Sequence, residues 1–170
     1  EPAVLNLSLG GSKSSTLEAA VRKAIEKEIV VVVAAGNNGL DACNFSPAGE
    51  LTAITVGAST SADSRASFSN TGTCVDMFAP GQSITSTWLA GGTRSSSGTS
   101  MATPHVAGAV AALWGSDFSL NSTEITDALL SSSSLNKLSN IGAGSPNRLL
   151  YVKADVGIAP SAPQNLSARA

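Results

Sequence analysis

The chain has 170 residues, of which 42% are hydrophobic and 13% are charged, so it is long enough and apolar enough to fold around a core. Its ten basic and twelve acidic residues give a formal net charge of −2, which provides no electrostatic basis for binding nucleic acid or an anionic membrane. The longest apolar run covers residues 29–35 and is far shorter than the roughly 20 residues of a membrane-spanning helix.

The first predicted elements are a strand, a helix and a second strand. Residues 3–9 and 29–35 are mostly apolar with little alternation, which is typical of parallel strands buried on both faces. Between them, apolar residues recur with helical spacing from Leu17 to Ile25, and Thr16 stands where an N-cap is expected. This order predicts a right-handed βαβ crossover and therefore an α/β fold with a parallel sheet.

Two short strands and a long helix are predicted next. Residues 51–57 and 74–79 have the composition of strands and are separated by loops rich in Ser, Asn and Gly. Residues 99–114 form the longest helical pattern, nearly uncharged and apolar on most faces. We therefore expect this helix to be buried in the centre of the domain.

The end of the chain carries one more helix, a last strand and a tail. The helix is predicted over residues 122–133, with Asn121 as its cap and Glu124 at the matching third position. Residues 147–152 are expected to form an edge strand. The segment 154–170 is rich in Ala, Pro, Ser and Asn, which predicts a linker. Part of it resembles the start of a fibronectin type III module, and a plain disordered tail is the alternative.

The two cysteines, Cys43 and Cys74, lie in surroundings rich in Gly, Asn and Ser that are typical of surface loops. Because an exposed free thiol is reactive, this setting favours a disulfide between them. A single pair of cysteines is weak evidence for a disulfide, so two buried thiols remain the alternative.

The strongest chemical signal is the segment 98–108, Gly-Thr-Ser-Met-Ala-Thr-Pro-His-Val-Ala-Gly. It places Ser100 where a loop turns into the long apolar helix, and the unpaired N–H groups of a helix start favour negative charge. Such a position can stabilise an oxyanion. A serine near a helix start can also be a simple N-cap, so the residue type alone does not decide between the two.

The whole string is similar to the nucleophile motif of the subtilisin family of serine proteases. Six further segments agree with that family in order and spacing, namely residues 8–11, 34–38, 46–48, 55–58, 68–70 and 78–81. The resemblance covers about residues 3–153 and is closest to the proteinase K and aqualysin branch. It implies a three-layer α/β fold with helices on both faces of the parallel sheet. Residues 1–153 would be the C-terminal part of the peptidase domain, incomplete at its N-terminal side, because the sequence starts as if cut within a domain.

This resemblance implies roles for the residues that match the family's motifs. Ser100 corresponds to the acylated nucleophile, and Asn37 to the side-chain donor that stabilises the oxyanion. A turn residue after a strand is the alternative role of Asn37. Ser8, Leu9 and Gly10 correspond to a segment that pairs with the substrate backbone, for which a purely structural strand is the alternative.

The resemblance also implies a substrate class and a pocket. Ala34, Ala35 and Gly36 correspond to one wall of the pocket for the side chain that precedes the scissile bond. Because these residues are small, the pocket would be roomy and would prefer apolar or aromatic side chains of a polypeptide substrate.

In the same branch a calcium ion is held by two backbone carbonyls and one carboxylate, which fall here on Leu51, Ala53 and Asp76. Only Asp76 can be matched by residue type, and a solvated loop aspartate is the alternative. Cys43 and Cys74 match the positions of a disulfide in this branch. The family further implies a secreted protein with no organic cofactor.

A serine protease needs a histidine base and an acid that orients it. The single histidine, His105, lies five residues after Ser100 and thus about 140° further around a helix, so we expect a packing histidine beside Pro104. The family order is Asp, His, Ser, so both partners would precede Glu1. We therefore expect the isolated chain to be inactive, to expose sheet edges and to need the missing N-terminal part of the same catalytic domain as a partner.

Other readings of the sequence are weaker, with one exception. An α/β-hydrolase would need a second glycine where Ala102 stands and a histidine much later in the chain, and none follows His105. A phosphate-binding loop would need a glycine directly before Lys13, where Ser12 stands. The serious alternative is a non-catalytic remnant of a protease that binds peptides or a partner.

Overall fold

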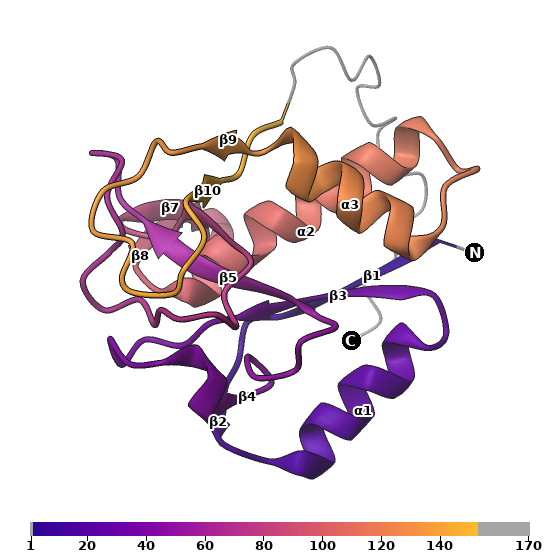
Figure 1. Cartoon of the computed structure of the whole chain (residues 1–170). Helices are drawn as coiled ribbons and strands as arrows, with labels where there is room; N and C mark the ends of the chain where they lie inside the picture. The colour runs from indigo at the N-terminus through magenta and orange to yellow at the C-terminus, as the bar shows by residue number, and fades with distance from the viewer. Residues whose placement is uncertain (1, 153–170) are drawn as a thin grey trace.

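The structure is a computed structural model that describes residues 2–152, and one mixed sheet organises this part of the chain (Figure 1). Across the sheet the strands are ordered β1 (Ala3–Leu7), β3 (Ile29–Ala34), β5 (Ile54–Ser59), β6 (Met77–Pro80), β10 (Arg148–Leu149) and β9 (Ser134–Leu135). Strands β1 to β10 in this order run parallel, and β9 is antiparallel to β10.

Helices cover both faces of the sheet, so the structure has three layers (Figure 1). Helix α1 (Ser15–Ile25) packs against β3 on one face. Helix α2 (Thr99–Ser116) crosses β1, β3, β5 and β6 on the other face, and α3 (Ser122–Ser132) packs beside it. The prediction of an α/β fold with helices on both faces of a largely parallel sheet is confirmed.

Strand β3 shows why the sequence gives this architecture. Its valines are all buried, and they alternate between two hydrophobic clusters. Val31 and Val33 pack with Val21 of α1, whereas Val30 and Val32 belong to the cluster that includes the inner face of α2. Each buried valine contributes on the order of 1.5 kcal/mol or more to folding, so a strand apolar at every position is stable only between two layers.

Strand β1 differs from the prediction. It ends at Leu7 instead of extending to residue 9, and most of its side chains are exposed, so the expectation that it is buried on both faces is wrong for this chain. The reason is its position, because β1 pairs on one side with β3, and no strand of residues 2–152 pairs with its other side. This outcome agrees with the expected uncovered sheet edge.

Local hydrogen bonds shift three predicted boundaries. Helix α1 is capped by Ser14, whose hydroxyl accepts from the N–H of Leu17 at 3.3 Å, and not by Thr16, which lies inside the helix. Strand β5 starts at Ile54 instead of residue 51, because the preceding residues form a turn closed by the bond from Ala53 N–H to the carbonyl of Glu50. Strand β6 starts at Met77 instead of residue 74, after a turn that precedes it.

The later elements are partly as predicted. Helix α3 has the expected capping box between Asn121 and Glu124. Helix α2 buries only the face that lies on the sheet, including Val106 and Val110, whereas Pro104 on the opposite face is exposed; the prediction that this helix is buried in the centre of the domain is therefore wrong. The last predicted strand shortens to β10, which is not at the edge because β9 lies outside it.

Two small ribbons were not anticipated from the sequence. Strand β2 (Gly11–Ser12) pairs with β4 (Phe45–Ser46), and β7 (Ile84–Thr87) pairs with β8 (Thr93–Ser96). Single turns of 3-10 helix occupy Ala42–Asn44 and Leu89–Gly91. These strands of two to four residues are too short for a periodic pattern to reveal them.

Cys43 and Cys74 form a disulfide, with a Cα–Cα distance of 5.3 Å. The alternative of two buried thiols is thereby excluded in this structure. The predicted linker at 154–170 and the fibronectin-like segment within it lie outside the described residues. Within residues 2–152, no helix has the length and apolar character needed to cross a membrane.

Candidate active site

The carboxyl ends of β1 and β3 bring together two segments that were singled out in the sequence. Ser8, Leu9 and Gly10 follow β1, and Asn37 follows β3 by three residues. Because the two strands are parallel neighbours, both segments leave the sheet at the same edge. Open α/β sheets bind ligands outside the carboxyl ends of their strands, so this edge is the first place to look for a site.

Helix α2 begins at this edge and places Ser100 in its first turn. The preceding loop is anchored by the N–H of Gly98, which donates to the carbonyl of Gly81 at 2.8 Å. Among the described residues the N–H of Ser100 has no acceptor, as expected for a first-turn amide. The helix dipole and this free donor make the surroundings of Ser100 favourable for negative charge.

The hydroxyl of Ser100 donates to the carbonyl of Ser8 at 3.0 Å. This contact joins residues separated by 92 positions and confirms that the helix start and the segment after β1 meet. Ser100 and Ser8 are both half-buried, so the hydroxyl lies at the boundary between the protein and solvent.

Asn37 is held beside the same helix start. Its Oδ1 accepts two hydrogen bonds from Thr99, one from the backbone N–H at 2.8 Å and one from the hydroxyl at 2.9 Å. Because both partners donate, the oxygen of the amide must face Thr99, and the Nδ2 donor is directed elsewhere. A Cβ at Gly98 would lie 3.6 Å from both Asn37 Nδ2 and Ser100 N, so these two donors, neither of which has an acceptor within residues 2–152, lie on the same side of Gly98.

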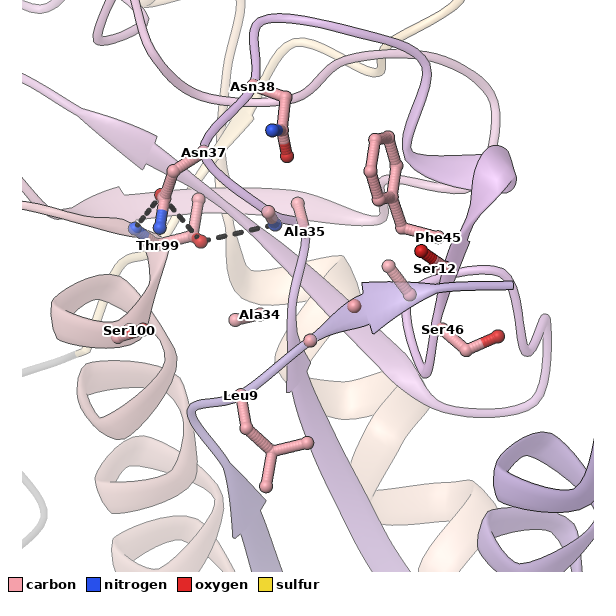
Figure 2. A pocket seen from close by; sticks show the side chains of 14 residues that line it. Leu9, Ser12, Ala34, Ala35, Asn37, Asn38, Phe45, Ser46, Thr99 and Ser100 are labelled. Atoms are coloured by element: carbon pink, nitrogen blue, oxygen red, sulfur yellow. Dashed lines mark hydrogen bonds between the residues drawn. The ribbon is translucent and has the colours of Figure 1, made fainter. Parts of the chain in front are cut away.

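A pocket of about 370 Å³ opens between these segments (Figure 2). Of the predicted site residues, its lining includes Leu9, Gly10, Ala34, Ala35, Gly36, Asn37 and Ser100. Figure 2 shows Asn37 and Ser100 on one side of the pocket, with Phe45 and Ser46 on the other. Ser8 is not part of the lining and reaches the site through its bond to Ser100.

The pocket also contains residues that were not proposed from the sequence. These are Gly11, Ser12, Asn38, Phe45, Ser46, Ala48 and Thr99. Thr99 and the Ser-Pro-Ala segment at 46–48 stood within motifs that had been recognised, so a signal existed for them. Phe45 had none, because it reaches the pocket only through the pairing of β4 with β2.

His105 does not contact Ser100 by a hydrogen bond. Its Nδ1 lies 2.8 Å from the carbonyl of Met101, one helical turn back. Both His105 and Ser100 line a hollow of about 330 Å³ on the side facing β7. The residue is exposed, so the prediction of a packing histidine is wrong, because it lies on the face of α2 that points away from the sheet.

Asp76 was expected to contribute to a calcium site. Its Oδ2 accepts from the N–H of Thr55 at 2.7 Å, which brings the carboxylate next to the start of β5, two residues after Ala53. Burial raises the pKa of Asp76 to about 6, against the lowering effects of the Thr55 N–H and of Arg148. A half-buried carboxylate next to a turn fits the oxygen ligands that calcium prefers.

The arrangement of a serine at a helix start, with a side-chain amide and a free backbone N–H beside it, is typical of serine hydrolases that stabilise an oxyanion. The subtilase family matches residues 1–151, and the chain belongs to this family.

Individual relatives agree with this assignment. An extracellular serine proteinase of Thermus sp. (strain Rt41A) is 53% identical over 153 residues, which are 89% of this chain and 37% of that protein. Alkaline serine exoprotease A of Vibrio alginolyticus is 47% identical over 154 residues, 91% of this chain and 29% of that protein. The crystal structure of a cold adapted subtilisin-like serine proteinase superposes with a TM-score of 0.87 at 50% identity, covering 91% of this chain and 56% of the other.

The chain therefore spans 37% and 29% of the length of these two curated relatives, and 56% of the solved structure.

Proposed function

We propose that this chain supplies the nucleophile and the oxyanion site of a serine endopeptidase that hydrolyses polypeptides through an acyl-enzyme. Ser100 is the nucleophile, and the Nδ2 of Asn37 and the N–H of Ser100 are the donors to the tetrahedral oxyanion. The observation that carries the proposal is the pair of bonds from Thr99 to Asn37 Oδ1, which holds the amide oxygen on Thr99 and leaves the Nδ2 donor near Gly98 and the N–H of Ser100. Removal of one such donor from a protease of this family lowers kcat roughly 10²- to 10³-fold.

The pocket supports a substrate assignment. Leu9 and Gly10 follow a strand and offer backbone groups for pairing with an extended peptide, and Ser8 contributes its carbonyl. The wall formed by Ala34, Ala35 and Gly36 is built of small residues, so the pocket of about 370 Å³ has room for a large side chain. Its lining by Ala48 and the ring of Phe45 favours an apolar or aromatic one.

The chain needs a base from outside the described residues. Without a histidine bonded to it, the hydroxyl of Ser100 keeps its proton, donates a hydrogen bond to the carbonyl of Ser8 and remains an ordinary alcohol. The partner that the family order implies is the N-terminal part of the same catalytic domain, which carries the aspartate and the histidine. The 170-residue chain alone is expected to have no useful turnover.

Two further assignments belong to this proposal. Calcium would be held by the carboxylate of Asp76 with the carbonyls of Leu51 and Ala53, and its role would be structural. Secretion is supported by the name of the Thermus relative, an extracellular proteinase, and by the disulfide, which is stable in oxidising compartments.

Labelling with a fluorophosphonate probe tests the nucleophile. The purified chain should remain unlabelled alone and should become labelled at Ser100 after addition of a polypeptide that carries the aspartate and histidine segments of a subtilase domain. The Ser100→Ala variant is the matched control and should stay unlabelled. Rapid labelling of the chain alone would contradict the need for a second polypeptide, and no labelling in the complex would contradict the assigned nucleophile.

A peptide-binding role without catalysis is the second candidate. It is favoured by the bond from Ser100 to Ser8, which leaves the hydroxyl unactivated. If the complex stays unlabelled while the chain alone binds an extended apolar peptide, and Gly10→Pro abolishes that binding, this second candidate replaces the first.

A further inference from the structure

Asn70 is fully buried and is bonded to the backbone on both sides of Asn37. We propose that Asn70 is a positioning residue of the active site, which fixes the backbone of the 35–40 segment so that the amide of Asn37 meets the oxyanion. This inference rests on the proposed function. Asn70 is not part of the pocket lining, so its effect is exerted through the segment that it holds.

The hydrogen bonds of Asn70 bracket Asn37. On the far side, Asn70 Oδ1 accepts from the N–H groups of Asn38 and Leu40, each at 3.0 Å. On the near side, Nδ2 donates to the carbonyl of Ala35 at 2.8 Å, and the backbone N–H of Asn70 donates to the carbonyl of Gly36 at 2.9 Å. Asn37 is therefore the one residue of the segment 35–38 that Asn70 does not bond, and its side chain is left free for the helix start.

Only an asparagine satisfies all these partners. The segment presents two backbone donors to Oδ1 and one backbone acceptor to Nδ2, and the amide of asparagine offers both kinds of group. Aspartate at position 70 would lack the donor for the buried carbonyl of Ala35, and alanine would remove the partner of all three backbone groups. The side chain thus fits its surroundings by chemistry as well as by size.

Gly36 shows how closely the segment approaches Asn70. Its φ of +101° is favoured only for glycine, and a Cβ at this position would lie 2.4 Å from Asn70 Nδ2. The contact is possible because Gly36 has no side chain. The position of the chain immediately before Asn37 is therefore set by a direct contact with Asn70.

The loop that carries Asn70 is itself rigidly held. Arg65 donates from Nη1 to three carbonyls, those of Ala66, Ser67 and Ser69, at 2.8 to 3.2 Å. The hydroxyl of Ser69 accepts from the N–H of Ala58 in β5 at 2.9 Å. Asn70 is thus tied to the central sheet, and the segment of Asn37 takes its position from that sheet. The backbone of Asn37 is fixed from this side, and its amide is fixed by Thr99 from the other.

The test compares Asn70→Ala with Ser145→Ala. Ser145 is also buried and polar, and its hydroxyl accepts from the N–H of Gly72 at 2.8 Å instead of bonding to the 35–40 segment. Four proteins are assayed for peptide hydrolysis in the complex with the triad-bearing polypeptide. They are these two single variants, Asn37→Ala and the double variant Asn37→Ala/Asn70→Ala. Asn70→Ala should lower kcat about 10- to 100-fold with little change in KM, because the donor is displaced only slightly.

The remaining variants distinguish a positioning role of Asn70 from a general loss of stability. Ser145→Ala should lower the unfolding temperature as Asn70→Ala does but should leave kcat within about twofold of the parent, since it leaves the oxyanion donor in place. In the Asn37→Ala background, Asn70→Ala should have no further effect on kcat, because there is no amide left to position. Asn70→Asp, which keeps the acceptor for the two N–H groups, should fall between the parent and Asn70→Ala.

The outcomes separate failure of the proposed oxyanion site from failure of the positioning role of Asn70. If Asn37→Ala leaves kcat unchanged, the proposed oxyanion site is wrong. If Asn37→Ala lowers kcat but Asn70→Ala behaves like Ser145→Ala, or multiplies the effect of Asn37→Ala, the positioning role is wrong and the proposed function stands. If Asn70→Ala does not fold, amide hydrogen exchange of the unmutated chain decides: the N–H groups of Asn38 and Leu40 should exchange as slowly as those of β3, and exchange at the rate of an open loop would overturn the inference.

Discussion

Asn37 Oδ1 accepts both the backbone N–H and the hydroxyl of Thr99, at 2.8 and 2.9 Å. The hydroxyl of Thr99 also accepts from the N–H of Gly36 at 3.2 Å, so one fully buried threonine joins the start of α2 to the loop after β3 (Figure 2). The two bonds to Asn37 fix the orientation of its amide, with Oδ1 on Thr99 and Nδ2 turned away from it. A site that must stabilise a transient charge gains from donors that are already oriented before the reaction.

Replacement of Thr99 by valine tests this orientation. Thr99→Val keeps the shape and the backbone N–H but removes the hydroxyl, and loss of such a bond at this fully buried side chain costs about 1–3 kcal/mol. We expect kcat in the complex to fall about tenfold, with Thr99→Ser close to the parent. Thr103→Val is the control, because its equally buried hydroxyl bonds only to the carbonyl of Thr99 within the helix. A similar fall in Thr103→Val would refute the assignment.

The disulfide should contribute strongly to stability. It joins Cys43 and Cys74 across a sequence separation of 31, and closing a loop of this length contributes on the order of 3 kcal/mol by restricting the unfolded chain. Urea unfolding of the Cys43→Ser/Cys74→Ser double variant should show this loss. Added reductant should destabilise the parent and leave the double variant unaffected. If reductant leaves the parent's midpoint in place, the disulfide has no such role.

The raised pKa of Asp76 predicts a stability that depends on pH in the absence of metal. Its pKa is about 6 in the folded chain and 3.8 in the unfolded reference, mainly because burial disfavours the carboxylate. The folded state therefore binds the proton more tightly. This difference contributes about 3 kcal/mol to the free energy of unfolding. The contribution is fully present below pH 3.8 and is lost as the pH rises through about 6.

Thermal unfolding in the presence of a chelator measures this effect. Between pH 5 and pH 7 the parent should lose more stability than Asp76→Asn, whose side chain has no proton to release. Equal slopes for the two proteins in this interval would show that Asp76 does not titrate as described.

Calcium should reverse the cost of burying this carboxylate. A free calcium concentration 100-fold above the Kd would stabilise the folded chain by about 2.7 kcal/mol, equivalent to roughly 5 to 10 °C in unfolding temperature. Asp76→Asn should lose most of this increase, and magnesium should produce less of it because it needs a stricter octahedral geometry. If calcium raises the unfolding temperature of Asp76→Asn as much as that of the parent, the ion binds elsewhere.

Much of the fold could be predicted from periodicity because the central layers have strong patterns. Strand β3 is apolar at every position, and α3 carries its capping box in its first residues, so both were found. Strand β1 has a similar composition but lies at an exposed edge. The composition of a strand shows whether it can be buried. Whether it is buried depends on which strands and helices cover it in the assembled sheet.

The candidate site also contains residues that could be predicted from the sequence and residues that could not. Ser100 and Asn37 stood in motifs, whereas Asn70 stood in a short segment, residues 68–70, with no visible reason for its amide. Its importance depends on three backbone groups about 30 to 35 positions earlier in the chain. Phe45 depends on a ribbon of two residue pairs. Contacts of this kind are set by tertiary structure and leave no local spacing to recognise.

The exposed edge of β1 has a practical consequence for handling this protein. Its sequence, Ala-Val-Leu-Asn-Leu, carries no charge and no proline, the two features with which natural sheets usually prevent edge-to-edge association. Two copies can therefore meet through these strands and extend one sheet into the next. Concentrated solutions of the chain should aggregate, and a lysine in place of Leu5, whose side chain is 39% exposed, is the simplest change to keep it monomeric.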